Sequence, residues 1–199
     1  MKRKNVNVIE LRRNQLTHAA YKVVSRKGYY NFTVRDIAKE AGLSTGLVHY
    51  YFKNKDDLLV SVLRVMNENL RSYLAKALEQ IEDPKEKIII FMDEAFHLVE
   101  REKEYFHVLI DFWTQINHNE RIRKANIKLY QSYRAECAKI IQEGIGKNVF
   151  NNVDVQYTAT MIVAFIQGLI IQYIIDNEAF DYTEYSKKMK SQIVDNLMK

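Results

Sequence analysis

Side chains suited to chemistry gather between Thr33 and Lys55, in the stretch TVRDIAKEAGLSTGLVHYYFKNK. Hydroxyl, imidazole, phenol, guanidinium and ammonium groups alternate there with apolar residues at helical spacing. Such groups hydrogen-bond to phosphates and to the edges of bases, and no nucleophile elbow or phosphate-binding glycine loop accompanies them. We therefore expect this stretch to contact nucleic acid.

Two short helices joined by a tight turn would position these groups. Thr33 is a suitable N-cap for the first helix, although Asp36 stands where a capping box usually has Glu or Gln. Gly42 is placed to end that helix in the left-handed conformation, and Ser44 to cap the next one. The residues of the second helix expected to face the core are Leu47, Val48, Tyr51 and Phe52.

The opposite face of the second helix would meet a major groove. Glycine inside a helix costs about 1 kcal/mol relative to alanine, and Gly46 would be explained by close approach of the backbone to a phosphate. Arg35 has the fork geometry that reads guanine, whereas Lys55 would hold a phosphate. The predicted DNA contacts are Thr33, Arg35, Ser44, Thr45, Gly46, His49, Tyr50, Tyr51 and Lys55.

This stretch resembles the TetR family of bacterial regulators. The resemblance rests on the run Ala41-Gly42-Leu43-Ser44-Thr45-Gly46, on the aromatic run Tyr50-Tyr51-Phe52, and on the Lys55 and Leu58 spacing. It extends upstream to Gly28-Tyr29 and further to Ala19-Ala20, and so covers about the first third of the chain. His49 departs from it, because the family often has Tyr there. The resemblance implies a repressor that binds a palindromic operator as a homodimer and responds to a small molecule.

Composition favours an all-α fold. The 199 residues are 47% apolar and include one Pro and six Gly, which is unlike a turn-rich β protein. We predict a three-helix DNA-binding domain over residues 1–54 and a helical ligand-binding and dimerisation domain over 55–199, with about nine helices in all. Beyond the two short helices, the expected ranges are 11–27, 55–80, 85–100, 103–118, 120–145, 153–176 and 182–199.

Positive charge is concentrated at the N-terminal end. Residues 1–57 hold twelve Lys and Arg against five Asp and Glu, whereas the whole chain has a net charge of only +5. A basic module on a mildly acidic body indicates DNA binding by the module and another task for the body. The segment 1–8, with Lys2, Arg3 and Lys4, is expected to be either a disordered terminus or an arm in the minor groove.

Many inward positions between residues 85 and 145 are aromatic. Taken singly, each is most simply core, but together they predict a cavity for a mostly apolar or aromatic effector. Arg134 would pair with an anionic group of that effector or extend to water. The predicted ligand-binding residues are Phe91, Phe96, Tyr105, Leu109, Trp113, Tyr130, Tyr133, Arg134 and Cys137.

The most apolar segment is Val153 to Asp176. Thr158, Thr160, Gln167 and Gln172 interrupt it and basic flanks are missing, so we do not expect a membrane span. A soluble helix that is apolar all round must be covered on two sides, which predicts a homodimer through the last two helices. With one cysteine and no apolar leader, the expected location is the cytoplasm.

No catalytic site, metal site or cofactor is predicted. Glu104, His107, Asp111 and His118 share a helical stripe, but this is more simply a solvated face than a metal site. Cys137 lies on an apolar face, where cysteine is commonly inert. Two alternatives stay open: an enzyme or carrier with a basic head, and a DNA-binding protein without an effector.

Overall fold

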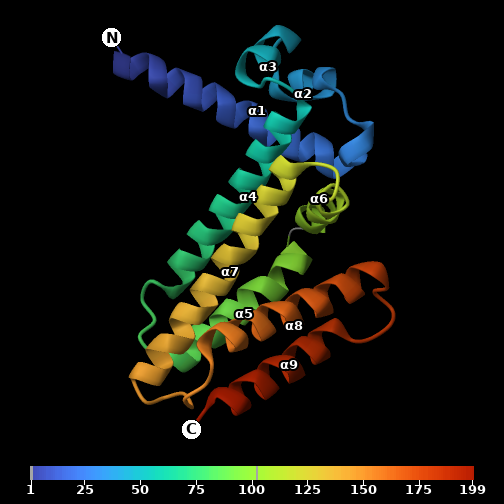
Figure 1. Cartoon of the computed structure of the whole chain (residues 1–199). Helices are drawn as coiled ribbons and strands as arrows, with labels where there is room; N and C mark the ends of the chain where they lie inside the picture. Colours follow the sequence, from blue (N-terminus) through green and yellow to red (C-terminus); the bar gives the residue numbers. More distant parts are fainter. Residues whose placement is uncertain (1, 102) are drawn as a thin grey trace. The chain divides into compact units, whose positions relative to one another are not determined.

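The computed structural model describes the backbone of residues 2–101 and 103–199 and the side chains of residues 8–101 and 106–199. Over this part of the chain it contains nine α-helices and, apart from one isolated bridge between Phe150 and Met198, no β-structure (Figure 1). The predicted all-α fold is confirmed. The helices are α1 (Lys2–Asn31), α2 (Val34–Ala41), α3 (Thr45–Tyr51), α4 (Lys55–Leu78), α5 (Pro84–Arg101), α6 (Lys103–Trp113), α7 (Glu120–Gly146), α8 (Val155–Ile175) and α9 (Tyr182–Leu197).

Helix α1 departs from the sequence prediction at both ends. It begins at Lys2 rather than Leu11, so the predicted arm is helical, and it continues past Gly28 to Asn31. Gly28 has φ 76° and ψ 165°, a conformation that residues with a Cβ rarely adopt, and it kinks the helix. The kink frees the amide of Tyr29 from the helix, and this amide donates to Asp111 Oδ2 of α6 at 2.8 Å.

The chain divides into two compact units. The first comprises residues 2–70 and 103–128, that is α1 to α3, the first part of α4, α6 and the start of α7. Its α1 packs against both α2 and α6, and α2 packs against α3. Helical spacing brings the apolar residues of these helices together, and the fully buried members of this core include Leu16, Ile37, Leu58, Leu59, Phe112 and Ile122.

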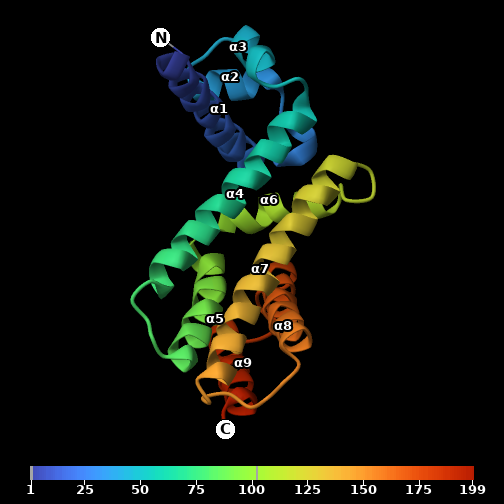
Figure 2. The same cartoon turned by 60° about the vertical axis from the view of Figure 1, so that its left-hand side comes forward.

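The second unit comprises residues 71–101 and 129–199. Here α5, α8 and α9 pack on one another, and α8 and α9 run side by side in both views (Figures 1 and 2). The Tyr182 hydroxyl of α9 donates to the carbonyl of Phe96 in α5 at 3.1 Å, and burial raises the pKa of this tyrosine. Glu143 of α7 accepts from Lys87 at 2.7 Å and from Lys147 at 2.8 Å.

Helix α8 keeps apolar side chains on a face that the second unit does not cover. Phe165 is 46% exposed and Tyr157 64% exposed, whereas Ile170 on the opposite side is buried. Among the described helices, α8 is the one long and apolar enough to cross a membrane, with a third of its most apolar stretch buried inside the chain. An exposed apolar stripe of this kind needs a partner.

These units do not follow the predicted boundary between residues 54 and 55. The division falls within α4 and again within α7, because α6 and the start of α7 share a core with α1. Helix α6 is also shorter than expected, since the chain leaves the helix after Trp113 and continues in turns to His118. The assignment of function to residues 1–54 and 55–199 stays a prediction.

Candidate DNA interface

Helix α2 begins at a complete capping box. Thr33 Oγ1 accepts from the Asp36 amide at 3.2 Å, and Asp36 Oδ2 accepts from the Thr33 amide at 2.8 Å. The box is complete although Asp36 stands where Glu or Gln is usual, because the shorter Asp side chain still reaches the N-cap amide. A hydrogen bond from Lys27, with those from Thr33, lowers the pKa of Asp36 to about 2.

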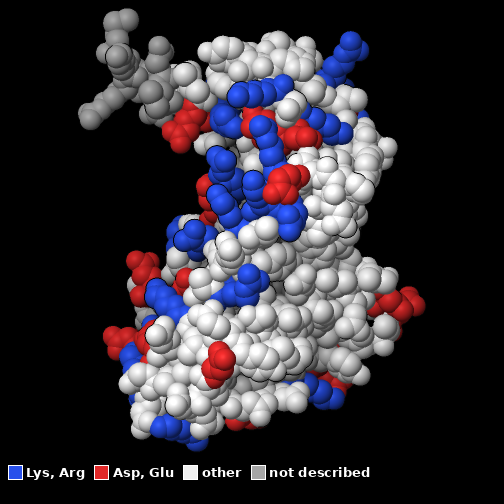
Figure 3. All heavy atoms as spheres, viewed as in Figure 1, with Lys and Arg blue, Asp and Glu red and all other residues white. Residues whose placement is uncertain are grey.

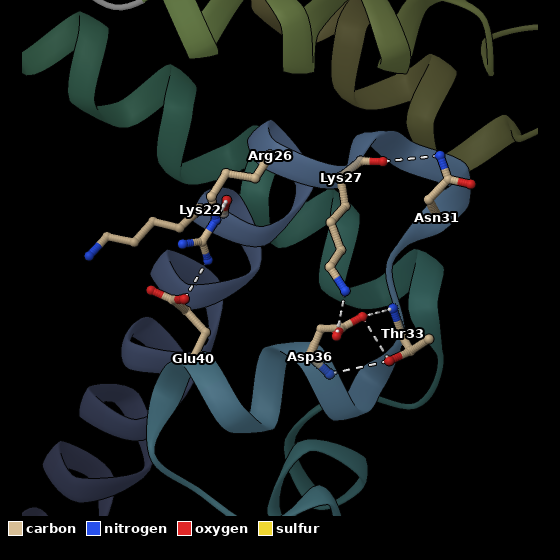
Figure 4. A network of polar contacts seen from close by, with 7 residues as sticks. All are labelled: Lys22, Arg26, Lys27, Asn31, Thr33, Asp36 and Glu40. Carbon is tan, nitrogen blue, oxygen red and sulfur yellow. Dashed lines mark hydrogen bonds and ion pairs between the residues drawn. The ribbon is translucent and has the colours of Figure 1, made fainter.

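Two ion pairs join α1 to α2 (Figure 4). Lys27 Nζ lies 2.7 Å from Asp36 Oδ1, and Arg26 pairs with Glu40, whose pKa it lowers. Both cations therefore hold α2 against α1 rather than facing solvent unpaired. Part of the positive charge counted in the sequence is neutralised within the unit.

The turn between α2 and α3 has the predicted conformation. Gly42 adopts φ 64° and ψ 32°, the left-handed geometry that ends a helix, and the Leu43 amide donates to the Ala38 carbonyl at 2.9 Å. Ser44 then caps α3, with its Oγ accepting from the Leu47 amide at 3.3 Å. The two helices thus form a helix-turn-helix.

One face of α3 is buried and the other is open. Val48 and Phe52 are buried as expected, but Leu47 is 36% exposed and Tyr51 is half-buried, so the core-facing side is narrower than predicted. With only seven residues, α3 completes about two turns and cannot turn four side chains inward. Thr45, Gly46, His49 and Tyr50 are all exposed.

Eight of the nine predicted contacts lie in or beside α2 and α3. Exposed Arg35 forms no hydrogen bond or ion pair with the described residues. Thr33 and Ser44 already act as helix caps, and Tyr50 packs edge-to-face on Tyr51 with ring centroids 5.1 Å apart. The groups left for a partner therefore concentrate on Arg35 and on the open face of α3.

Lys55 is the exception. Its Nζ donates to the Tyr29 carbonyl at 2.9 Å and lies 3.9 Å from the ring centroid of Phe32, and burial lowers its pKa. The ammonium thus satisfies a carbonyl in the last turn of α1, where carbonyls have no amide donor within the helix. Its neighbour Lys53, which the set of predicted contacts omits, is exposed and its ammonium has no partner among the described residues.

The predicted ligand-binding residues fall in both units. Leu109 and Trp113 belong to the first, whereas Phe91, Phe96, Tyr130, Tyr133, Arg134 and Cys137 belong to the second. Tyr105 lies outside the described side chains. Phe91, Phe96, Leu109 and Cys137 are buried, and burial raises the pKa of the Cys137 thiol to about 12, so this residue is a neutral packing group at physiological pH.

The first unit also contains a basic pocket that was not predicted from the sequence. Lys53 and residues of α4 and of the start of α7 line a half-open pocket of about 370 Å³, and five of these lining residues are Lys or Arg. Figure 3 shows Lys and Arg atoms gathered where these two helices begin. A sequence signal existed, since Arg121, Lys124 and Lys128 recur at spacings of three and four residues and so share one helical face.

Known proteins match the chain along most of its length. Residues 16–62 match the model of bacterial regulatory proteins of the tetR family, and residues 84–197 match that of the C-terminal part of BetI-type transcriptional repressors. The chain belongs to the TetR family of transcriptional regulators. Members of the TetR family are non-enzymatic DNA-binding proteins that form dimers and bind small-molecule effectors.

Individual TetR relatives agree over almost the whole chain. The fatty acid metabolism regulator protein of Bacillus subtilis is 25% identical in an alignment of 194 positions that covers 92% of this chain and 94% of the relative. A transcriptional regulator from Saccharomonospora viridis, solved with choline, is 25% identical with a TM-score of 0.84 over 94% of this chain and 97% of that one. The regulator FadR from Bacillus subtilis, solved with stearoyl-CoA, shares the fold with 23% identity and a TM-score of 0.74, over 92% and 97% of the two chains.

Proposed function

We propose that the chain is a cytoplasmic repressor that binds a palindromic operator as a homodimer and leaves it when a small effector binds. The observation that carries the proposal is the open face of α3, where Thr45, Gly46, His49 and Tyr50 are exposed on a helix capped at both ends. Exposed polar groups on the second helix of a helix-turn-helix are the ones that reach base edges in the major groove.

In this proposal Arg35 reads a base and Lys53 holds a phosphate. An exposed guanidinium without an internal partner can form both hydrogen bonds to guanine, whereas an ammonium acts as a point charge. Lys53 takes the role that the sequence assigned to Lys55, because the Lys55 ammonium is engaged by Tyr29 and Phe32. The other predicted contacts keep their proposed roles.

The test is a binding titration with DNA from upstream of the chain's own gene and with a scrambled duplex of equal length. We expect the native duplex to bind more tightly, and Arg35→Ala to cost about 1 to 3 kcal/mol on that duplex alone. Lys39→Ala is a suitable control, because Lys39 is an exposed cation of the same helix. Equal affinity for both duplexes would contradict a sequence-specific regulator.

The proposed effector is small and partly apolar. Buried aromatic and aliphatic residues of the predicted ligand set, such as Phe91 and Phe96, would contact its apolar part. The two relatives solved with ligands hold compounds of opposite charge, because choline is a cation and stearoyl-CoA carries phosphates. The positive charge of the basic pocket in the first unit therefore bears on the choice between a cationic and an anionic effector.

Release from the operator would follow from linkage. A ligand that binds the free protein more tightly than the DNA-bound protein must weaken DNA binding by the same factor. Calorimetric titration of stearoyl-CoA and of choline, with and without operator, measures that factor. A ligand with equal affinity in both titrations would not be the effector.

A further inference from the structure

The basic pocket of the first unit is large enough for a small molecule. It lies between the early turns of α4 and of α7, and its volume of about 370 Å³ falls within the range of ligand sites in proteins. Every residue that lines it belongs to the first unit. Its lining includes the apolar side chains of Val60, Leu63 and Ala125, so one part of an occupant would lie against apolar atoms.

The charge of the wall is strongly positive. The described residues that line the pocket include one carboxylate, that of Asp57, and five cations: Lys53, Arg64, Arg121, Lys124 and Lys128. This carboxylate is already used, because it accepts from the Lys53 amide at 3.2 Å and lies 3.8 Å from Arg13, outside the pocket. Among the described residues, the Lys124 ammonium forms one ion pair, an exposed contact of 3.6 Å between Nζ and Glu120 Oε1.

The other four cations are not compensated. The side chains of Lys53, Arg64, Arg121 and Lys128 form no hydrogen bond or ion pair within the described part of the chain. Like charges held around one cavity repel one another, and a ligand with several negative charges would relieve this repulsion. Arg64 and Arg121 also supply planar forks suited to phosphate oxygens.

A hydrogen-bonding group lines the same pocket. The Oδ1 atom of Asn67 is buried without a donor in the described structure. Because this oxygen has no donor among the described residues, a rotation of the amide would offer it to an occupant that carries N–H or O–H groups. Such an occupant combines several phosphate charges with N–H or O–H groups and some apolar surface.

We infer that this pocket binds a small molecule carrying at least two phosphate groups, of the nucleoside diphosphate type. Free nucleotides and the nucleotide part of a coenzyme A thioester share this chemistry. The charge excludes choline from this pocket, because an ammonium would add to the repulsion. Such a ligand would also regulate DNA binding. Lys53 would contact either the ligand or a DNA phosphate, so the ligand and the DNA would compete for it.

Titration calorimetry at constant ionic strength tests the inference with ADP, coenzyme A, stearoyl-CoA and inorganic phosphate. We expect at least one diphosphate compound to bind at least tenfold more tightly than inorganic phosphate. Binding of ADP and coenzyme A alike would indicate recognition of the nucleotide alone, whereas stronger binding of stearoyl-CoA would indicate the thioester. Absence of binding by all three organic compounds at millimolar concentration would overturn the inference.

Matched variants separate a built site from general attraction. The double variant Arg64→Ala/Arg121→Ala should weaken the tightest diphosphate compound at least tenfold. Arg123 is an exposed cation of α7, the helix of Arg121, but it does not line the pocket. Arg123→Ala should therefore change the affinity for the diphosphate compound less than twofold. Equal losses in the two proteins would contradict the site, and thermal melts would show that both are folded.

This ligand site rests on the proposed function as a regulator. The ligand titrations contain no DNA, however, so their outcome does not depend on whether the protein binds an operator. A parallel titration with operator DNA tests the competing occupant. If the Arg64 and Arg121 variant loses DNA affinity while no diphosphate compound binds the unaltered protein, the pocket wall is a DNA contact. If diphosphate compounds bind but leave operator affinity unchanged, the site stands and its role in control is refuted.

Discussion

At the scale of single residues, Gly46 distinguishes a structural role from a DNA-binding role. A Cβ added there would come no closer than 3.8 Å to Ser44 Oγ, so nothing inside the protein requires glycine. Gly46→Ala should leave the free energy of unfolding unchanged or raise it slightly, because alanine favours helices. The same change should weaken operator binding, since the Cβ would meet the DNA backbone. Urea unfolding and anisotropy titration measure both quantities, and undiminished operator affinity would count against close approach at this residue.

Lys55 presents the opposite case, a lysine in the DNA-binding head that the fold itself uses. Lys55→Ala leaves the Tyr29 carbonyl without its donor and should cost about 1 to 3 kcal/mol of stability. Lys53→Ala, two residues earlier, removes an exposed ammonium and should change stability by less than about 0.5 kcal/mol. It should instead lower the slope of log affinity against log salt by about one unit. Should Lys55→Ala lower the salt slope and leave stability intact, Lys55 would be the phosphate contact.

At the scale of elements, the stability of the junction between α1 and α2 should depend on pH in the acid range. The pKa of Asp36 is about 2 in the folded protein against an ordinary 3.8, so its carboxylate stabilises the fold fully above pH 3.8. That contribution disappears as the pH falls through 3.8 toward 2. The stability difference between the unaltered protein and Asp36→Asn should therefore shrink over this window in urea unfolding curves.

A suitable control for the acid series is Glu10→Gln. Glu10 is an exposed acid of α1 that forms no ion pair with other described residues. Some pH dependence should persist in Asp36→Asn, because Arg26 also lowers the pKa of Glu40. A difference that stays constant from pH 5 to pH 2 would show that the Asp36 carboxylate does not stabilise the junction.

The end of α7 offers a second test at this scale. A Cβ at Gly144 would lie 2.1 Å from Cδ2 of the buried Phe150, whereas a Cβ at Gly146 would meet nothing within 4 Å. Gly144→Ala should therefore lower stability by about 1 to 3 kcal/mol through overpacking, and Gly146→Ala should not. Thermal melts of the two variants make the comparison, and equal melting temperatures would mean that Phe150 can move aside at no cost.

At the scale of the whole molecule, the open face of α8 should form the dimer interface. Phe165→Asp places a carboxylate on the exposed stripe and should yield a folded monomer. Ile170→Asp places one in the core of the second unit and should unfold it. Sedimentation with circular dichroism distinguishes the outcomes. A dimer that survives Phe165→Asp would place the interface elsewhere on the chain.

Local features of the sequence were sufficient to predict α2, α3 and the residues that cap them. Ser44 and Gly42 act within one helical turn of their own positions, so their chemistry is visible in the sequence without any knowledge of the fold. The open face of α3 followed from spacing for the same reason. Leu47 was placed wrongly, because a short helix buries only what its neighbours cover.

Contacts between distant residues could only come from the tertiary structure. The Lys55 ammonium reaches the Tyr29 carbonyl across 26 positions of sequence, and the Tyr29 amide reaches Asp111 across 82. Likewise, the basic pocket exists because α7 brings Arg121 and Lys128 to the same cavity as Arg64 of α4. The sequence determined which residues carry charge and which prefer helices. Which charges are neutralised and which face one another was decided by packing, because electrostatic interactions depend on distance and burial rather than on position along the chain.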